Sequence, residues 1–361
     1  MDISSEPHGD AGAPSLAGRD KATAQNATAR PFGFFHVLLF AGATAIVLLL
    51  KPFVLAAYPL TILSHILVFS IACLGLNVLF GTAGSFSLGH ATYFGVAAYT
   101  GAFLYRFYSI ESLEAYLASG LLASASFAAV IGFFCARTTK IFFVLLTLSF
   151  SMVAHSLVID GAVFMLFGGL GWALYLLGEG SMYLPRFTIL GIEFNPHEFN
   201  SAFYNVIVAA FIVTVLLLWR ISRSPFGQAL KAIRDNEIRA AFIGIPVWQY
   251  RWYAFIISGF FVGLAGGLYG QLARQITPEQ LHWIFSAQLV LAIVLGGMRH
   301  FLGPILGAFV FVGLDEFASR WTVGRNLAFG ILLIIVVFVF PRGIAGAVIA
   351  LTKMVRNWRH T

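Results

Sequence analysis

Long apolar runs separated by polar connections make up most of this chain. The runs fall at about 34–50, 58–80, 87–105, 116–136, 141–166, 203–219, 252–270, 281–298, 301–314 and 327–340. A helix needs about 20 residues to cross a hydrocarbon core, and the first seven runs are long enough. The last three are shorter, and Gly296-Gly297 and Gly303-Pro304 interrupt them. The pattern therefore predicts an all-α polytopic membrane protein of about ten transmembrane helices, some of them short or broken.

The two ends of the chain and two of its connections lack this apolar character. Residues 1–31 are rich in Ala, Ser, Gly and Asp and show no apolar periodicity, which predicts a disordered cytoplasmic tail. We expect a transmembrane domain over 32–345 and a basic cytoplasmic tail over 346–361. Within the domain, 167–202 is expected as an extracytoplasmic loop and 220–251 as a cytoplasmic loop.

Composition and charge agree with a membrane location. The chain is 59% hydrophobic and 10% charged, and its mean hydropathy of +0.87 excludes an ordinary soluble domain. The formal net charge is +7, but the basic residues are spread over the connections rather than gathered in one patch, so we expect no nucleic-acid partner. Most of them fall inside if both termini are cytoplasmic, which predicts an N-in, C-in topology.

The cytoplasmic loop contains a polar, basic stretch from Arg223 to Gly244 that has the pattern of two short helices. Pro225 suits the first turn of one helix, Asp235 suits the N-cap of a second, and Gly244 suits its end. The first helix carries an apolar stripe of Phe226, Leu230 and Ile233. Two interpretations fit: an amphipathic helix resting on lipid headgroups, or a docking site for a soluble partner.

Residues 75–99 form a second unusual segment, in which glycines and hydroxyl side chains interrupt an apolar run. Broken backbone at membrane depth is tolerated where it is buried in protein or lines a cavity, and freed backbone groups there can bind a polar solute. The candidates for a translocation path are Ser87, Gly89, His90 and Tyr93. Close helix packing through small residues explains the same pattern, and His90 would then be a satisfied packing histidine.

His155 and Asp160 lie within the fifth apolar run. Ionisable groups inside a span are costly and are candidates for a transport pathway. Asp160 also fits a position near the outer water interface. Their separation of five residues exceeds one helical turn, so a mutual hydrogen bond is not expected.

Glycines recur near a spacing of four within the run at 252–270. They are Gly259, Gly263, Gly266, Gly267 and Gly270. Small residues at this spacing let two helix backbones approach closely in a membrane. We therefore predict a close helix–helix face here rather than a binding site.

Several motifs of catalysis are absent from the sequence. No lysine stands in a Gly-Lys-Ser/Thr phosphate loop, so ATP hydrolysis by that route is excluded. The sequence also lacks the His-Glu-x-x-His zinc motif, paired-cysteine metal spacing and a Gly-x-Ser-x-Gly nucleophile elbow. We expect no catalytic residues, no metal site and no bound cofactor.

The motifs occur in an order that resembles the LivM-type permeases of branched-chain amino-acid and urea ABC importers. The matching segments are Gly75-Leu-Asn77, Ser87-Leu-Gly-His90, Gly95, Tyr99, Phe226-Gly227, Ala232-Ile-Arg-Asp-Asn-Glu237, Gly244-Ile245, Ser258–Tyr269, Val294–Gly297, Gly303–Ala308 and Phe340–Gly343. The resemblance covers roughly 60–345. It implies the ABC importer permease fold and an inner-membrane subunit of bacteria.

The resemblance also implies partners and residue roles. A second permease, two cytoplasmic ATPases that use ATP, and an extracytoplasmic substrate-binding protein would complete the importer. Contact with the ATPases would fall to Arg234, Asp235, Asn236, Glu237 and Gly244. The chain departs from the family where Gly168-Gly-Leu-Gly171 is followed by Trp172-Ala-Leu-Tyr, which leaves the solute open among amino acids, urea, amides and aromatic acids. A stand-alone secondary transporter or channel is the competing hypothesis.

Overall fold

Helices account for nearly all regular structure in the part of the chain that the structure describes. The computed structural model describes residues 57–138, 140–159, 181–319, 325–339 and 343–346, and all of these fall within one unit, residues 48–361. The expected tails (1–31 and most of 346–361), the apolar run at 34–50, and Asp160 lie outside the described residues.

Every apolar run from 58–80 onward contains a described helix, as predicted. The helices are α3 (Ala57–Asn77), α4 (His90–Tyr108), α5 (Leu113–Cys135), α6 (Lys140–Ile159), α9 (Pro196–Arg223), α10 (Pro225–Asp235), α11 (Glu237–Phe242), α12 (Val247–Ala273), α13 (Trp283–Gly296), α14 (Gly303–Ser319) and α15 (Arg325–Val339). Among the described residues, five helices are long and apolar enough to cross a membrane. This confirms a mostly helical, multi-span chain.

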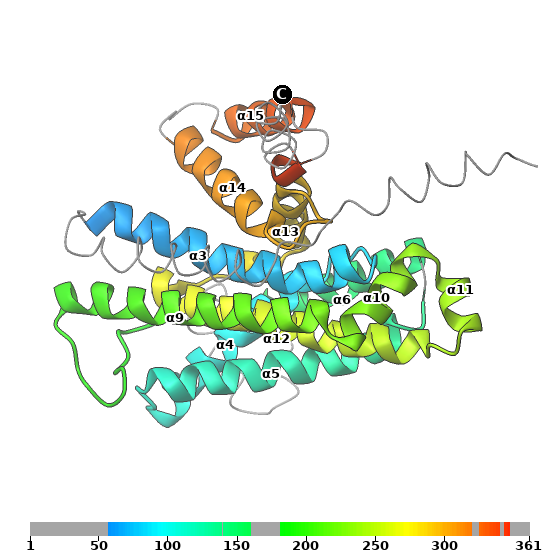
Figure 1. Ribbon diagram of the computed structural model, residues 1–361. Helices are drawn as coiled ribbons and strands as arrows, with labels where there is room; N and C mark the ends of the chain where they lie inside the picture. The colour runs from blue at the N-terminus through cyan, green and yellow to red at the C-terminus, as the bar shows by residue number, and fades with distance from the viewer. Residues whose placement is uncertain (1–56, 139, 160–180, 320–324, 340–342, 347–361) are drawn as a thin grey trace, which may run out of the picture. The chain divides into compact units, whose positions relative to one another are not determined.

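Helix α3 lies at the centre of the packing and α6 at its edge. In the apolar window of α3, 83% of the residues are buried, against 22% for α6. Helix α3 packs against α9 on one side and α12 on the other, and α12 packs in turn against α5, with α10 and α11 at one end (Figure 1). We call this the α10–α11 end and the other the far end. The exposed apolar side chains of α6, such as Phe142, suit contact with lipid.

The glycine face predicted on α12 is confirmed. A Cβ at Gly259 would collide with Ala128 of α5, one at Gly263 with Ser124 of α5, and one at Gly266 with the backbone carbonyl of Phe94 in α4. The helices can approach this closely only because side chains are missing along the line of contact. Helix α12 is therefore wedged between α4 and α5.

The broken backbone predicted after α3 is also present. Helix α3 passes into a π-helix, Val78–Thr82, and irregular backbone then runs to the start of α4 at His90. Gly84 takes a left-handed φ of 73°, which a side chain would disfavour. Gly95 is one of the glycines in the segment 75–99, but it does not break the helical backbone. It lies inside α4, where a Cβ would collide with Leu281.

Residues 274–282 turn back into the bundle at the far end of α12. The short 3₁₀ helix Pro278–Leu281 packs against α4 and α6, and Ser151 of α6 donates a hydrogen bond to the Leu281 carbonyl at 3.0 Å. Helix α13 then starts within the bundle and is only 14 residues long, or about 21 Å. It ends at Gly296, with Gly297 as its C-cap, and a hairpin to α14 follows. The two helices lie close together, since a Cβ at Gly307 of α14 would collide with the Ala292 carbonyl.

Three details of the described chain differ from what the sequence pattern predicts. The described chain is not strictly all-α, because β1 (Met182–Tyr183) pairs antiparallel with β2 (Gln275–Ile276). Helix α9 begins at Pro196, inside the expected loop 167–202, because proline and the acidic Glu198 suit a first turn. It continues to Arg223, past the expected start of the loop 220–251, so the connection to α12 is shorter.

We predict that Gly266→Ala lowers the free energy of unfolding by about 1–3 kcal/mol, because the added methyl group meets backbone that cannot move aside. Thermal unfolding of the detergent-solubilised protein measures the effect. Gly313→Ala is the matched control in a helix, since nothing lies within 4 Å of the added carbon. An equal loss in both variants would contradict the close contact.

Candidate functional site

Helix α10 is held against the membrane helices by its apolar stripe. Leu230 and Ile233 are buried, as the predicted stripe requires. Ser224 caps the helix by accepting a hydrogen bond from the Gly227 amide at 3.3 Å, and Pro225 occupies the first turn. The helix is therefore packed on the protein rather than lying free on a lipid surface.

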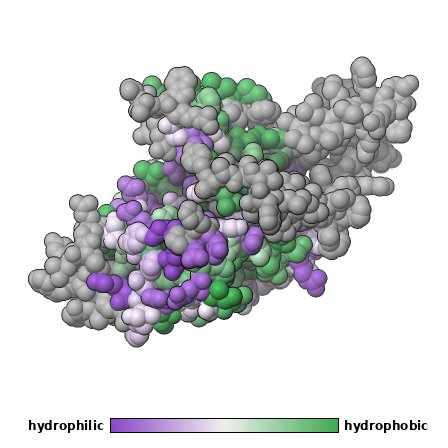
Figure 2. Space-filling view, turned by 90° about the vertical axis from the view of Figure 1, so that its left-hand side faces the viewer, coloured by the Kyte–Doolittle hydropathy of each residue, from purple (hydrophilic) through white to green (hydrophobic). Residues whose placement is uncertain are grey.

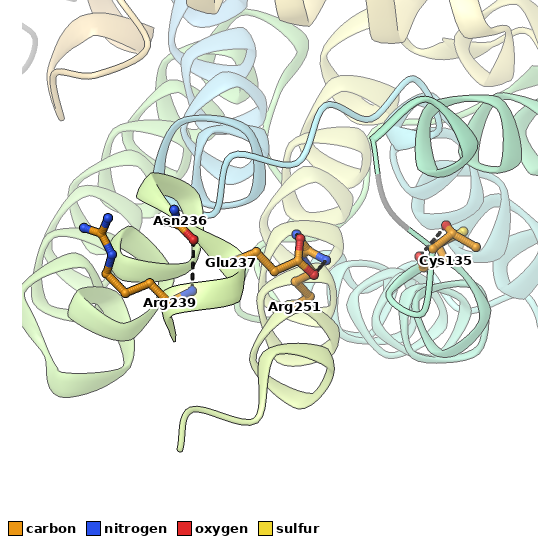
Figure 3. Close-up of polar contacts among 6 residues, drawn as sticks. Cys135, Asn236, Glu237, Arg239 and Arg251 are labelled. Carbon is orange, nitrogen blue, oxygen red and sulfur yellow. Dashed lines mark hydrogen bonds and ion pairs between the residues drawn. The ribbon is translucent and has the colours of Figure 1, made fainter. Parts of the chain in front are cut away.

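The N-cap of α11 is Asn236 and not Asp235, which corrects the sequence prediction. Asn236 Oδ1 accepts a hydrogen bond from the Arg239 amide at 2.9 Å, whereas Asp235 is the last residue of α10 (Figure 3). Either residue type caps well, and the continuation of α10 by one residue decided between them. Gly244 follows α11 with φ of 88°, as expected for a helix stop.

An ion pair fixes α11 to the start of α12. The two terminal guanidinium nitrogens of Arg251, Nη1 and Nη2, donate to the two carboxylate oxygens of Glu237, each at 2.8 Å (Figure 3). The Arg251 side chain is 12% exposed and that of Glu237 is 39% exposed. Two parallel bonds in a partly dry site give defined geometry as well as attraction. A six-residue helix that would be unstable alone thus gains a fixed orientation.

Arg234 connects α10 to the broken segment that follows α3. Its Nη1 donates to the Gly81 carbonyl at 2.7 Å, and its Nε and Nη2 contact Asp235. Gly84 packs so closely on Arg234 that a Cβ there would overlap the arginine side chain. Helix α10 is therefore attached directly to the π-helix Val78–Thr82 that follows α3.

Lys231 of α10 is partly buried next to two arginines. Burial lowers the pKa of Lys231, and the nearby positive charges of Arg234 and Arg223 lower it further. The Lys231 ammonium donates to the Ser222 carbonyl at 3.0 Å, near the end of α9. A cation at a helix C-terminus is stabilised by the free carbonyls there.

Helix α11 presents a cluster of exposed apolar side chains, which we call the α11 tip. It consists of Ile238, Phe242 and Ile243, whose exposed fractions are 69%, 87% and 70%. Gly244, at which the chain turns away from the helix, follows directly after these residues. Large apolar groups gathered at the end of a charged connection are typical of a surface that another protein covers.

The candidates in the broken segment form a hydrogen-bonded chain inside the protein. Ser258 donates to the Gly75 carbonyl at 2.8 Å, so its oxygen accepts from Nε2 of His90, also at 2.8 Å. Nδ1 of His90 then accepts from Ser87 at 2.9 Å. Both ring nitrogens therefore have a hydrogen-bond partner. His90 and Ser87 are fully buried, which matches the packing interpretation.

The other two candidates of this segment are also closely packed. Tyr93 is fully buried, and a Cβ at Gly89 would lie 2.6 Å from the Thr147 carbonyl of α6. Neither residue lines any of the described cavities. The segment holds α3, α4, α6 and α12 together.

His155 lines a cavity of about 710 Å³ between α3, α6, α12, α13 and α14. Its ring lies 4.8 Å from that of His282, the residue that precedes α13. His65, Gln280 and Asp315 also line this cavity. We call it the histidine-lined cavity. Of the residues proposed for a path, His155 is the one the structure places at a cavity; the placement of Asp160 is outside the described residues.

Sequence reasoning missed His65, Gln280, His282 and Asp315. The rule that selected His155, an ionisable group in an apolar run, also applies to His65 in 58–80 and His282 in 281–298. No sequence signal shows that these residues meet, because they come from different helices. The fold of the segment 274–282 brings them together.

Most of the chain matches a known protein family. Residues 58–340 match the model of the family described as branched-chain amino acid transport system / permease component. The chain belongs to this family. The resemblance inferred from its motifs is thus confirmed, and as a permease component the protein is a multi-span membrane subunit and not a catalytic one.

This permease is also similar in sequence to individual transport permeases from other organisms. It is 25% identical over 326 residues to the high-affinity branched-chain amino acid transport system permease protein LivM of Escherichia coli, covering 85% of this chain and 74% of the relative. It is 28% identical to a probable LivH permease of Methanocaldococcus jannaschii, over 45% and 53% of the two chains. It is 32% identical to the guanosine permease protein NupQ of Bacillus subtilis, over 34% and 37%.

We predict that Asn236→Ala speeds hydrogen exchange at the Arg239 amide about fivefold, because loss of an N-cap costs about 1 kcal/mol. Exchange measured by mass spectrometry over 237–243 reports the change. Asn195→Ala is the matched control, since Asn195 precedes α9 without a side-chain capping bond. Unchanged exchange in α11 would show that the ion pair alone holds this helix.

Proposed function

We propose that this protein is the membrane subunit of an ATP-driven importer and that α10 and α11 dock the ATPase. The α11 tip carries this proposal, because its exposed apolar side chains project from a helix fixed by a cap and by the Glu237–Arg251 ion pair. Arg234, Asp235, Asn236, Glu237 and Gly244 shape this surface, and the Arg234 bond to Gly81 carries its motion into the membrane helices.

The importer would contain a second permease, two cytoplasmic ATPases and an extracytoplasmic substrate-binding protein. The family is that of branched-chain amino acid permeases, and relatives extend to a guanosine permease. We therefore propose a branched-chain amino acid or a related small polar molecule as the solute. The protein would lie in the bacterial inner membrane with about ten spans and both termini inside.

We place the solute path at the histidine-lined cavity rather than at the broken segment. Ser87, Gly89, His90 and Tyr93 are packed among helices, whereas His155 lines open space. Their proposed role is positional: they hold the segment that Arg234 contacts. If instead the chain is a stand-alone transporter or channel, it will carry solute without any ATPase.

For sidedness, single cysteines at Glu193 and Arg239 should react with membrane-impermeant maleimide from opposite sides, Glu193→Cys from outside and Arg239→Cys from inside. Both residues are exposed, and the natural Cys73 and Cys135 are buried, so background labelling is low. Labelling of intact cells and of inverted vesicles separates the two sides. Reaction of both positions from one side would contradict the topology.

For coupling, the double variant Ile238→Ala, Phe242→Ala should weaken ATPase binding more than tenfold. Each side chain buried on docking contributes about 1.5–3 kcal/mol, and both are exposed before docking. The affinity of the purified ATPase for the nanodisc-reconstituted permease pair measures this, together with ATP-driven uptake. Leu190→Ala, which removes an 80% exposed side chain distant from α11, is the control. Unaltered binding and uptake in the double variant would refute docking at the α11 tip.

A further inference from the structure

The histidine-lined cavity has the size and the mixed chemistry of a small-molecule site. Its volume of about 710 Å³ lies within the range of roughly 300–1,000 Å³ seen for such sites. One part of its wall is aromatic, with Phe69 stacked on Phe311 at 5.4 Å and edge-on to Phe285 at 6.2 Å. The rest is polar. A ligand held here would contact apolar and polar groups at once.

The polar part of the wall consists of imidazoles, carboxamides, carboxylates and the hydroxyl groups of Tyr269 and Thr277. No lysine or arginine is among its described lining residues. Asp315 of α14 and Glu279 of the 3₁₀ helix supply the carboxylates. Asp315 lies close enough to His65 to interact with it electrostatically. The formal charge of the lining is therefore negative when the imidazoles are neutral.

Gln280 adds an amide group to the cavity wall, and its side chain also hydrogen-bonds the Tyr269 hydroxyl. The residue is 9% exposed, lines the cavity, and its Oε1 has no hydrogen-bond partner among the described residues. A buried carbonyl oxygen without a donor is costly, so such groups are normally paired. A ligand that donates hydrogen bonds would satisfy it.

The cavity lies where the chain turns back into the bundle. Glu279, Gln280 and His282 belong to the segment between α12 and α13, which begins at β2 at the far end. Figure 2 looks onto that end and shows hydrophilic residues gathered there. A solute arriving from the side opposite α10 and α11 would meet this segment first.

We propose that the histidine-lined cavity binds a solute that carries a protonated amine on a small apolar group. The ammonium lies between Asp315 and Glu279 and donates to Gln280 Oε1, and the apolar part lies against Phe69, Phe285 and Phe311. As a step on a transport route the site rests on the proposed function, but its binding chemistry is independent of ATPase docking.

Charge selectivity of the cavity tests the first half of the proposal. Gln288 lines the cavity and the two natural cysteines are buried, so Gln288→Cys gives one reactive thiol. In the full chain reconstituted with its partner subunits in nanodiscs, we expect a trimethylammonium-ethyl methanethiosulfonate to react about tenfold faster than the sulfonatoethyl reagent, or about 1.4 kcal/mol. Asp315→Asn should remove most of this preference.

Glu198→Gln is the control, because Glu198 lies in α9 and does not line the cavity. It should leave the preference intact. Thr277→Cys, also at the cavity, replaces Gln288→Cys if that variant is not stably inserted. A thiol that does not react, or a preference that Asp315→Asn leaves unchanged, would overturn the proposal.

Ligand protection tests the second half. Isopentylamine and isopentanol have nearly the same size and differ in charge, so we expect the amine to slow labelling by uncharged methyl methanethiosulfonate at least tenfold more effectively. Equal protection by the two, or none, would show that the cavity holds no ammonium site. Either result would leave ATPase docking untouched, since the docking assay reads out α11 alone.

Discussion

The absence of side chains along one face of α12 is the constraint on which the rest of the structure depends. Gly259, Gly263 and Gly266 allow α12 to sit against α4 and α5 at a distance that other residues would prevent. In a membrane this packing replaces the hydrophobic effect, because lipid tails are as apolar as the helix surfaces. The position of α12 then fixes the location of the segments attached to its two ends.

Those two ends carry the two sites of interest. At one end Arg251 orients α11 through Glu237, and at the other the chain passes through β2 into the segment that bears Gln280 and His282. Helix α10 is connected separately to the π-helix that follows α3, because Arg234 donates a hydrogen bond to the Gly81 carbonyl. If an ATPase docks at the α11 tip as proposed, α12 and the hydrogen bond from Arg234 to Gly81 connect it to the helices around the cavity. Such a connection suits rigid-body motion of helices better than local bending.

Much of this architecture could be read from the sequence, and the reasons for the failures are physical. The apolar runs located the helices, and the spacing of glycines identified the close face of α12, because both are local patterns. The sequence predicts Asp235 as the cap where the structure has Asn236, because adjacent residues with similar capping ability cannot be ranked without knowing where α10 ends. His90 cannot be assigned to packing from the sequence, because its partner Ser258, which forms a hydrogen bond with Nε2, is 168 residues away. The histidine-lined cavity was missed because it is formed by tertiary contacts alone.

The glycine contacts of α12 also decide which substitutions in this family can be compensated. At Gly263 the obstacle is the side chain of Ser124, and at Gly259 it is the methyl group of Ala128, so a smaller residue on α5 can restore the space. At Gly266 the obstacle is the backbone carbonyl of Phe94, which every residue carries. Evolution can therefore exchange the first two positions together with their partners, whereas Gly266 has no second-site remedy and must be retained wherever α4 and α12 approach in this way.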